Sequence, residues 1–314
     1  MKIIKAILWG PAGFYLLSST SEPNVEPAWD SGVTYSTGSR VIALSGFSSS
    51  HPGESIFESL VDQNLNYDPN AYSSGATIKW RNLGPANKWA MFDNLVGTMT
   101  ESSATGTFTV VLSPDQIVNS LALLKVVADT IDVTMTYQSS TVYSKAIDLT
   151  TGAYYRYPGV NGPEADIVLL DLPAHKNSAS RANDCLITVT FTSSGKLSFC
   201  GNLVIGELYS LGETQYSPKL GIIDYSLKNV DAFGNYSVLQ RKYSKRLAVV
   251  LELPSSQVDE VFNILAEYRT TPLVWIGADD RYRSMFIWGF YKDFEIDVAY
   301  PSVSFLSLSV EGLA

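Results

Sequence analysis

The chain has 314 residues, of which 46% are hydrophobic and 17% are charged, and this composition excludes a disordered protein. Its 31 acidic and 22 basic residues give a formal net charge of -9 without a long basic run, so nucleic acid is excluded as the main partner. The length predicts two or three domains, and the abundance of Tyr, Trp, Ser and Thr predicts a mainly β protein.

Residues 1–26 open with MKIIKAILWGPAGFYLLSST, whose basic start and apolar middle imitate a secretion signal. Gly10 and Pro11 interrupt the apolar run, and no span reaches the roughly 20 residues that a membrane helix needs. We therefore expect a retained N-terminal strand or arm and no insertion into a membrane.

Residues 27–84 show short alternating runs separated by turns, which predict a small β module. A Ser/Gly-rich loop, SGFSSSHPGES, is expected in its middle. The module resembles the chitin-binding-type carbohydrate modules of families 5 and 12, which occur in chitinases and in bacteriophage tail proteins. The resemblance is carried by Trp29, Asp30, Tyr35, Gly38, Arg40, Val41, Phe57-Glu58-Ser59-Leu60, Asp68-Pro69 and Trp80. The long loop departs from the tight turn of those families.

Aromatic rings held on a sheet can stack on the C–H faces of sugars. The candidates for carbohydrate binding are Trp29, Tyr35, Tyr67, Tyr72 and Trp80. Trp29, Tyr35 and Trp80 can equally form the core of so small a module. Tyr67 and Tyr72 fall in a polar loop, which favours exposed contacts.

Residues 85–212 predict one β-sandwich with jelly-roll character, because short strands follow one another with regular turn signals. The expected strands are 105–112, 120–128, 130–138, 141–149, 165–172, 185–192 and 196–206. Ile131, Val133, Met135 and Tyr137 share one face by alternation. Trp89, Met91 and Phe92 are expected to pack at the start of the domain.

Cys185 and Cys200 flank a segment that is expected to turn near Ser193-Ser194-Gly195 as a hairpin. The two sulfurs are then either small buried hydrophobic groups or a disulfide across adjacent strands. Two cysteines and two histidines give no basis for a structural zinc site.

The sequence contains no catalytic constellation. His51 and His175 are expected in separate polar loops, and no nucleophile elbow, zinc-protease, phosphate-loop or dinucleotide-binding motif occurs. Asp279 and Asp280 are interpreted as part of a solvated turn rather than as a metal or glycosidase pair. We therefore expect no enzyme activity, no cofactor and no metal.

The stretch from Leu203 to Arg246 is polar but carries bulky residues in a regular rhythm, unlike a flexible linker. Within it, residues 213–246 predict an extended arm laid on other surfaces, including neighbouring copies of the chain. The candidate interface residues are Tyr209, Tyr216, Tyr225, Phe233, Tyr236, Tyr243 and Arg246. The alternative is that these side chains pack within one chain.

Residues 247–314 predict an α+β domain with one amphipathic helix on an antiparallel sheet. The helix is expected from 255 to 269, with Val258, Val261, Phe262, Leu265 and Tyr268 on one apolar stripe. Ser256 and Asp259 resemble a capping box at its start. Strands are expected at 245–253, 272–277, 284–291, 293–298 and 302–313.

The segment CGNLVIGELYSLGETQYSPKLGIIDYSLKNVDAFGNYSVLQRKYSKR, with the strand-helix-strand tail after it, is similar to proteins of the tail-tip gene block of long-tailed bacteriophages. In that family -TQYG- precedes -G-I-D-YS- and R-YSKR, so Ser217 replaces a glycine. The C-terminal portion also resembles part of the distal tail or baseplate proteins that build rings. The resemblance implies a virion component and brings no catalytic residues with it.

The leading hypothesis is therefore a structural baseplate or tail-tip protein, made in the host cytoplasm and carried in the virion. It would form a trimeric or hexameric ring, contact other tail-tip proteins and bind a host-surface glycan. One alternative is a secreted bacterial carbohydrate-binding protein or a non-catalytic part of a glycan-degrading system. Another is a structural connector whose sugar module has lost its ligand site.

Overall fold

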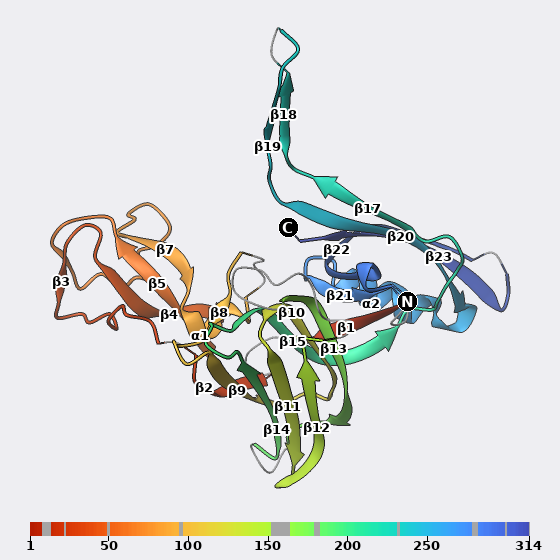
Figure 1. The fold of residues 1–314 in the computed structure, drawn as a ribbon, viewed down its shortest axis with the longest axis horizontal. Coiled ribbons are helices and arrows are strands. Elements are labelled where there is room, and N and C mark those ends of the chain that lie inside the picture. Colours follow the sequence, from red (N-terminus) through yellow and green to blue (C-terminus); the bar gives the residue numbers. More distant parts are fainter. Residues whose placement is uncertain are drawn as a thin grey trace. The chain divides into compact units, whose positions relative to one another are not determined.

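The computed structural model describes residues 1–7, 14–21, 23–48, 51–93, 97–151, 164–178, 183–230, 233–277, 282–298 and 300–313 (Figure 1). The chain folds into two compact units, one made of Met1–Ala6 with Glu207–Ala314 and the other of Ile7–Gly206. The described residues are mainly in antiparallel strands, which confirms the expected fold class. The division differs from the five expected segments, because the first strand belongs to the same unit as the C-terminal part of the chain.

The unit Ile7–Gly206 contains a β-sandwich. One sheet has the order β12-β11-β14-β9-β2, and the other places β10 between β13 and β15, with β8 also on β15. The bounds are β2 Phe14–Ser19, β8 Thr100–Glu101, β9 Thr107–Pro114, β10 Val118–Val127, β11 Thr130–Tyr137, β12 Ser140–Asp148, β13 Glu164–His175, β14 Cys185–Thr192 and β15 Phe199–Ser210.

Alternate residues of both sheets meet in one core, as the period of two requires. Ile131, Val133 and Met135 are fully buried, and Tyr137 packs at the edge of the same cluster. Trp89 and Met91 are buried as expected, and Phe92 packs against the core.

The expected hairpin between Cys185 and Cys200 is wrong. Cys185 starts β14 in one sheet and Cys200 lies in β15 of the other, so the connection crosses the sandwich. Both thiols are free and buried, and they pack as small hydrophobic groups. Burial, aided by the charge of Asp184, raises the pKa of Cys185 to about 12. Burial also raises the pKa of Cys200.

The same unit holds the small module. Its strands are β3 Thr34–Tyr35, β4 Arg40–Ser48, β5 His51–Ser59, β6 Asn64–Leu65 and β7 Trp80–Pro85, and the short helix α1 Asn87–Ala90 follows. The expected loop at 45–55 is wrong, because β4 and β5 stay paired through Leu44↔Glu54 and Ser45↔Gly53. Ladder hydrogen bonds come from the backbone, so a Ser/Gly-rich composition does not prevent pairing. The expectation that both histidines lie in loops is also wrong, because His51 begins β5 and His175 ends β13.

The second unit is an antiparallel sheet with one helix. The strand order is β1-β21-β22-β23-β20-β16, and β17 also pairs with β20. The bounds are β1 Lys2–Ala6, β16 Glu213–Thr214, β17 Lys219–Asp224, β20 Tyr243–Pro254, β21 Leu273–Ile276, β22 Phe286–Asp297 and β23 Val303–Gly312. The helix α2 spans Val258–Glu267 after the 3-10 turn Ser255–Gln257 (η2), and a second 3-10 turn spans Arg283–Met285 (η3).

Three local expectations for this unit are corrected. The two strands expected around 284–298 are the single strand β22, interrupted by a bulge between Tyr291 and Asp293. No side-chain cap forms at α2, because the residues before it are already in a 3-10 turn. Val261 and Leu265 of the stripe are buried against the sheet, but Phe262 is 52% exposed.

Residues 213–246, expected as an extended arm, form several paired strands. Glu213 and Thr214 pair with β20, and the chain then forms a ribbon of two antiparallel strands (Figure 1). In the ribbon β17 pairs with β20, and beyond them β18 Leu227–Val230 pairs with β19 Tyr236–Leu239. We call residues 219–246 the arm. In a two-stranded ribbon, unlike a single extended segment, the backbone groups between the strands are hydrogen-bonded to each other. The backbone groups on the two outer edges can still pair with another strand.

Candidate functional site

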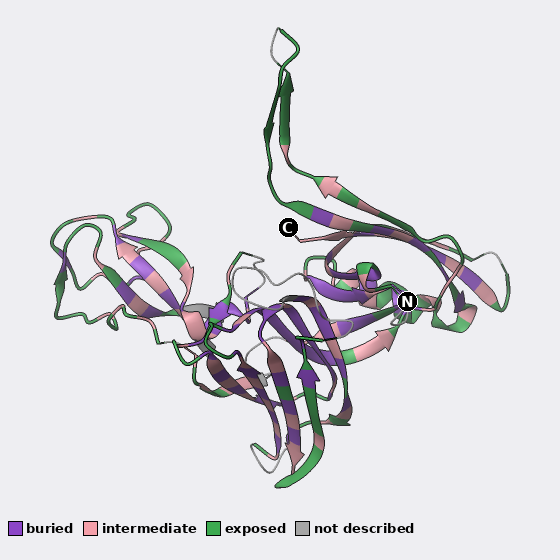
Figure 2. Ribbon diagram, in the orientation of Figure 1, coloured by how far each residue is buried: buried purple, intermediate pink, exposed green. Residues whose placement is uncertain are grey.

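The outer part of the arm is exposed, as the exposure colouring shows, whereas its base is partly buried and Ser244 there is fully buried (Figure 2). All residues of β18 and β19 are exposed, and Tyr236 keeps 77% of its surface. Phe233 is 91% exposed, and Tyr216, just before the arm, is fully exposed. Other large apolar residues exposed in the arm are Leu220, Ile222, Tyr225, Leu227, Val230, Val238, Leu239 and Tyr243.

The outer part of the arm has no core of its own. In the described part of the chain, β18 and β19 pair with each other and with no third strand. An isolated two-stranded ribbon is at best marginally stable in water, and its unpaired edges are templates for further pairing. Apolar side chains on both strands then remain in water unless another surface covers them.

Polar contacts fix the point where β17 gives way to β18. Lys228 Nζ lies 2.8 Å from Asp224 Oδ2, and Ser226 N donates to Asp224 Oδ1. The hydrogen bonds from Lys228 and Ser226 hold the pKa of Asp224 well below its usual range. Arg241 N donates to Ser226 Oγ from the returning strand. The junction between β17 and β18 is therefore held by side-chain hydrogen bonds and is unlike a flexible linker.

Of the seven expected interface residues, Tyr209 is placed differently from the rest. It packs against the core of its own unit, with Lys5 Nζ 5.2 Å from its ring centroid. Burial, then a hydrogen bond to Glu260, raises the pKa of Tyr209 to about 12. Arg246 and the five aromatic residues after Tyr209 are exposed. Tyr209 thus follows the alternative of packing within one chain.

Two of the five carbohydrate candidates are core residues. Trp80 is fully buried and Tyr35 is 7% exposed, with their ring centroids 5.3 Å apart. Trp80 Nε1 donates to the carbonyl of Tyr67 at 2.8 Å, and Asp30 N donates to the hydroxyl of Tyr35 at 2.8 Å. A ring without a free face cannot stack on a sugar, so both take the structural role that the sequence left open.

The other three candidates are partly exposed. Tyr67 and Tyr72 meet edge to face with centroids 4.9 Å apart, and Lys79 Nζ lies 4.9 Å from the Tyr67 centroid. Trp29 packs against the module core, and its buried Nε1 has no hydrogen-bond partner among the described residues. Tyr67, Tyr72 and Lys79 together offer ring surface and an ammonium donor, a combination that suits a polar ligand with apolar faces.

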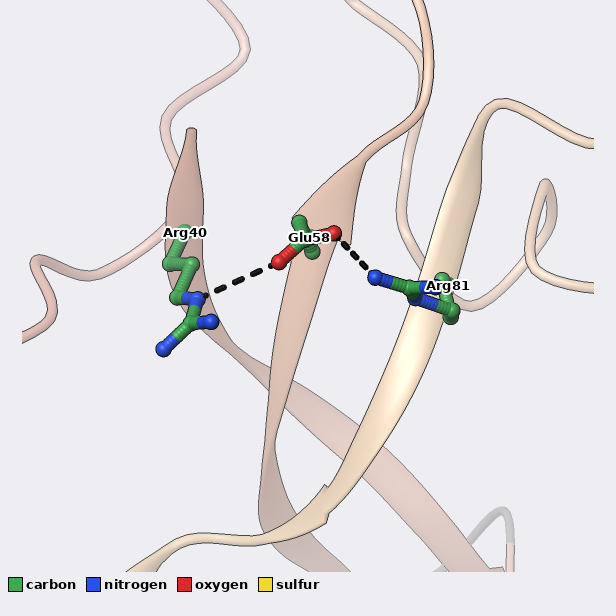
Figure 3. A network of polar contacts seen from close by, with 3 residues as sticks. All are labelled: Arg40, Glu58 and Arg81. Carbon is green, nitrogen blue, oxygen red and sulfur yellow. Dashed lines mark hydrogen bonds and ion pairs between the residues drawn. The ribbon is translucent and has the colours of Figure 1, made fainter. Parts of the chain in front are cut away.

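A charge network that sequence reasoning missed crosses this sheet. Glu58 lies between Arg40 and Arg81 on three neighbouring strands and is bonded to both (Figure 3). Arg40 Nε is 3.3 Å from Glu58 Oε2, and the Glu58 side chain is 15% exposed. Burial raises the pKa of Glu58, but the hydrogen bonds and charges of Arg81 and Arg40 outweigh it and lower that pKa overall. The signal available in the sequence was opposite charges at facing strand positions.

The remaining candidates do not converge on a reactive centre. Asp279 and Asp280 lie outside the described residues. His175 stacks on Tyr137 with ring centroids 4.3 Å apart. Within the described ranges, no group of three or more His, Cys, Asp or Glu side chains is placed to hold a metal ion. In the same part of the chain, no helix has the length and apolar character to cross a membrane.

Comparison with known proteins identifies no family for this chain. No protein-family model and no curated protein matches the chain. Among solved structures, it is similar to chitosan-binding module 1 of a chitosanase/glucanase from Paenibacillus sp. IK-5, in a selenomethionine-labelled V110M form. The identity is 16% and the TM-score 0.26, over 38% of this chain and 83% of that one. So slight a likeness assigns neither a fold nor a ligand to this chain.

Proposed function

We propose that this protein is a structural component of a bacteriophage tail tip, which assembles with copies of itself and with other tail proteins through the arm. We further propose that residues 27–84 bind a glycan of the host surface. The observation that carries the proposal is the exposed ribbon, whose apolar side chains and unpaired edges are features of a surface awaiting a partner. The role in a tail tip rests on the sequence resemblance.

The composition of the arm supports this use. Tyr and Arg are enriched in protein interfaces, and the arm exposes Tyr225, Tyr236, Tyr243, Arg241 and Arg246. An arm that contacts a different surface on the next copy generates a ring when the rotation closes. Ring assembly therefore needs one arm and one receiving surface on each copy, related by a rotation that closes.

The conformation of Ser217 supports the resemblance to tail-tip proteins. Its φ is 71°, in the left-handed region that favours glycine. In those proteins a glycine stands at this position. The backbone at the base of the arm thus has the shape that a family glycine would take, although this chain carries serine.

Light scattering with a shortened arm tests the assembly. Residues 227–239 would be replaced by Asn-Gly, which joins Ser226 to Gln240 near the existing contact from Arg241 N to Ser226 Oγ and keeps β17 on β20. The full chain is expected to form a trimer or hexamer, alone or with a tail neighbour. The shortened chain is expected to stay monomeric.

The matched control removes apolar surface elsewhere. Leu44 and Ile78 of the module are 56% and 48% exposed, and changing both to Ser should leave the assembly unchanged. A full chain that remains monomeric with and without its tail neighbours would contradict the proposal.

Glycan binding is tested by titration with chitin oligosaccharides. Tyr67→Ala and Tyr72→Ala should each weaken binding about tenfold or more, because each removes a stacking surface of roughly 1–3 kcal/mol. Tyr137→Ala in the sandwich is the control and should change nothing. A monomer that binds such sugars would favour the secreted carbohydrate-binding protein, and an assembling chain that binds no glycan would favour the structural connector.

A further inference from the structure

Charge is divided unevenly between the arm and the rest of the chain. The arm contains six Lys and Arg residues and two Asp residues, a formal charge of +4. The chain as a whole carries -9, so the remaining residues carry -13. In the described part of the chain, the side chains of Arg241, Lys242 and Arg246 form no ion pair. The arm is therefore a basic element on an acidic protein.

One face of the second unit's sheet is acidic, and most of its residues are exposed in the part of the chain that the structure describes. The residues of β20, β23 and β22 that point away from α2 are Ala248, Val250, Glu252, Phe305, Ser307, Ser309, Asp293, Glu295 and Asp297, which face one another in register. We call them the acidic face. The opposite face, which includes Leu251, Leu306 and Leu308, is buried with Val261 and Leu265 of α2.

Asp293, Glu295 and Asp297 form a row along this face. Alternate residues of a strand lie roughly 7 Å apart on one side, so the three carboxylates repel one another. All three are exposed, and within the described ranges none of them is in an ion pair. Asp is depleted in strands, so such a row calls for a countercharge from outside the sheet.

A groove runs over the acidic face at the base of the arm. Its volume is about 290 Å³, and Asp293, Glu295 and Val250 line it together with Tyr216 and Lys219. Val250 is 43% exposed there. The groove thus combines an apolar floor with two carboxylates and the ammonium group of Lys219.

The outer arm has the complementary pattern. The register of β18 and β19 places Val230, Tyr236 and Val238 on one side of the ribbon, with Lys228 beside them. These three apolar side chains are 55%, 77% and 61% exposed. Arg241 and Lys242 follow directly at the end of β19. An apolar strip flanked by cations matches an apolar floor flanked by carboxylates.

We propose that the arm of one copy of this chain docks on the acidic face of a second copy. This inference rests on the proposed function and names the receiving surface. We choose a second copy as the partner because every copy of this chain carries both the basic arm and the acidic face. Lys219 at the base of the arm lines the groove of its own chain, but β18 and β19 lie beyond Arg246, where the pairing of β20 with β23 ends, and so continue past the sheet. Residues 222–230, which lie beyond that point, span roughly 26 Å when extended, enough to reach a neighbour.

Paired charge reversals test the contact by sedimentation. One variant reverses the arm with Arg241→Glu and Lys242→Glu, and another reverses the acidic face with Asp293→Lys and Glu295→Lys. Each is expected to raise the dissociation constant of self-association by about tenfold or more, because like charges would then face each other. Asp132→Lys with Glu267→Lys reverses two exposed carboxylates elsewhere and should leave association unchanged.

Combining the two charge reversals distinguishes loss of the contact between copies from unfolding of the variant. Both reversals in one chain should restore association, and so should an equal mixture of the two singly reversed chains. Near-ultraviolet circular dichroism of each variant checks its packing. Association that persists in both reversed variants, or a folded fourfold variant that stays monomeric, would overturn the inference while the proposed function stands. A wild-type chain that never self-associates would overturn both.

Discussion

Ser217 holds a backbone conformation that costs free energy for any residue with a Cβ. Its φ of 71° lies in the left-handed region, where the cost is about 1–2 kcal/mol relative to glycine. Glycine in turn lowers the free energy of unfolding by roughly 0.5–1 kcal/mol, because it has more conformational freedom in the unfolded chain. We therefore predict that Ser217→Gly raises the free energy of unfolding by up to about 1 kcal/mol, measured by urea denaturation.

The control for this prediction is a serine in ordinary strand conformation. Ser307 lies in β23 of the same unit and is exposed on the acidic face. Ser307→Gly should lower the free energy of unfolding by about 0.5–1 kcal/mol. Equal effects of the two substitutions would show that the conformation at Ser217 carries no strain.

Glu58 makes the stability of the small module depend on pH. Its pKa is lowered in the folded chain, because the hydrogen bonds and charges of Arg81 and Arg40 outweigh the effect of burial. A carboxylate with a lowered pKa stabilises the fold above its unfolded pKa, near 4.5, and loses that effect as the pH falls through the folded value. We predict that the Tm advantage of the wild type over Glu58→Gln is present at pH 7 and disappears in acid.

A carboxylate without such partners serves for comparison. Glu267 is exposed on α2, and the structure places it in no ion pair among the residues that it describes. The Tm difference between wild type and Glu267→Gln should change little between the same two pH values. A Glu58→Gln difference that persists undiminished in acid would contradict the role of the network.

At the scale of elements, the small module separates core aromatic residues from surface ones. Trp80 is fully buried and its indole N–H is hydrogen-bonded, so Trp80→Ala should cost about 3–5 kcal/mol or unfold the module. Tyr67→Ala should cost about 1 kcal/mol or less, since its carbonyl still accepts the indole hydrogen bond and its ring is partly in water. Urea denaturation distinguishes the two, and equal losses would show that Tyr67 is also a core residue.

Strand positions were the most predictable feature of the sequence. The alternation in Ile131, Val133 and Met135 fixes both the strand and its buried face, because the side-chain period of a strand is two. Pairing partners were less predictable. Nothing in the residues between Cys185 and Cys200 distinguishes a hairpin from a crossing between sheets. The strand β22 was divided in error because a bulge interrupts alternation without ending the strand.

The sequence predicts which aromatic residues could form the candidate site but not which of their rings are exposed. Trp80 and Tyr67 are both aromatic residues of the same small module, yet one is buried and the other half-exposed. Only the packed structure decides which ring keeps a free face. The same holds for Tyr209 and Tyr236, which share a rhythm in the sequence but lie against the core and on the arm respectively. The acidic face could not be predicted from the sequence, because its carboxylates come from β20 and β22, which are paired only through β23.

At the scale of the whole molecule, the separation of charge sets how association should respond to salt. In the proposed contact between copies, an arm of +4 would be attracted to a remainder of -13, and this attraction is screened when the Debye length falls from about 10 Å at 0.1 M salt to about 3 Å at 1 M. Apolar contacts of Tyr236 and Val238 are not weakened in this way, and excluded salts such as sulfate strengthen them.

We therefore predict that sodium chloride between 0.1 and 0.5 M weakens self-association of the wild type by about tenfold or more, measured by sedimentation. The chain with both arm and face reversed should depend less on salt than the wild type, because its arm has a formal charge of 0 and only the four exchanged side chains still attract one another. The chain with only the arm reversed should associate weakly throughout this range, because Arg241→Glu and Lys242→Glu lower the formal charge of the arm from +4 to 0 and leave no net attraction to screen. If salt strengthened association of the wild type, the apolar strip would dominate and the charges would serve only to orient the arm.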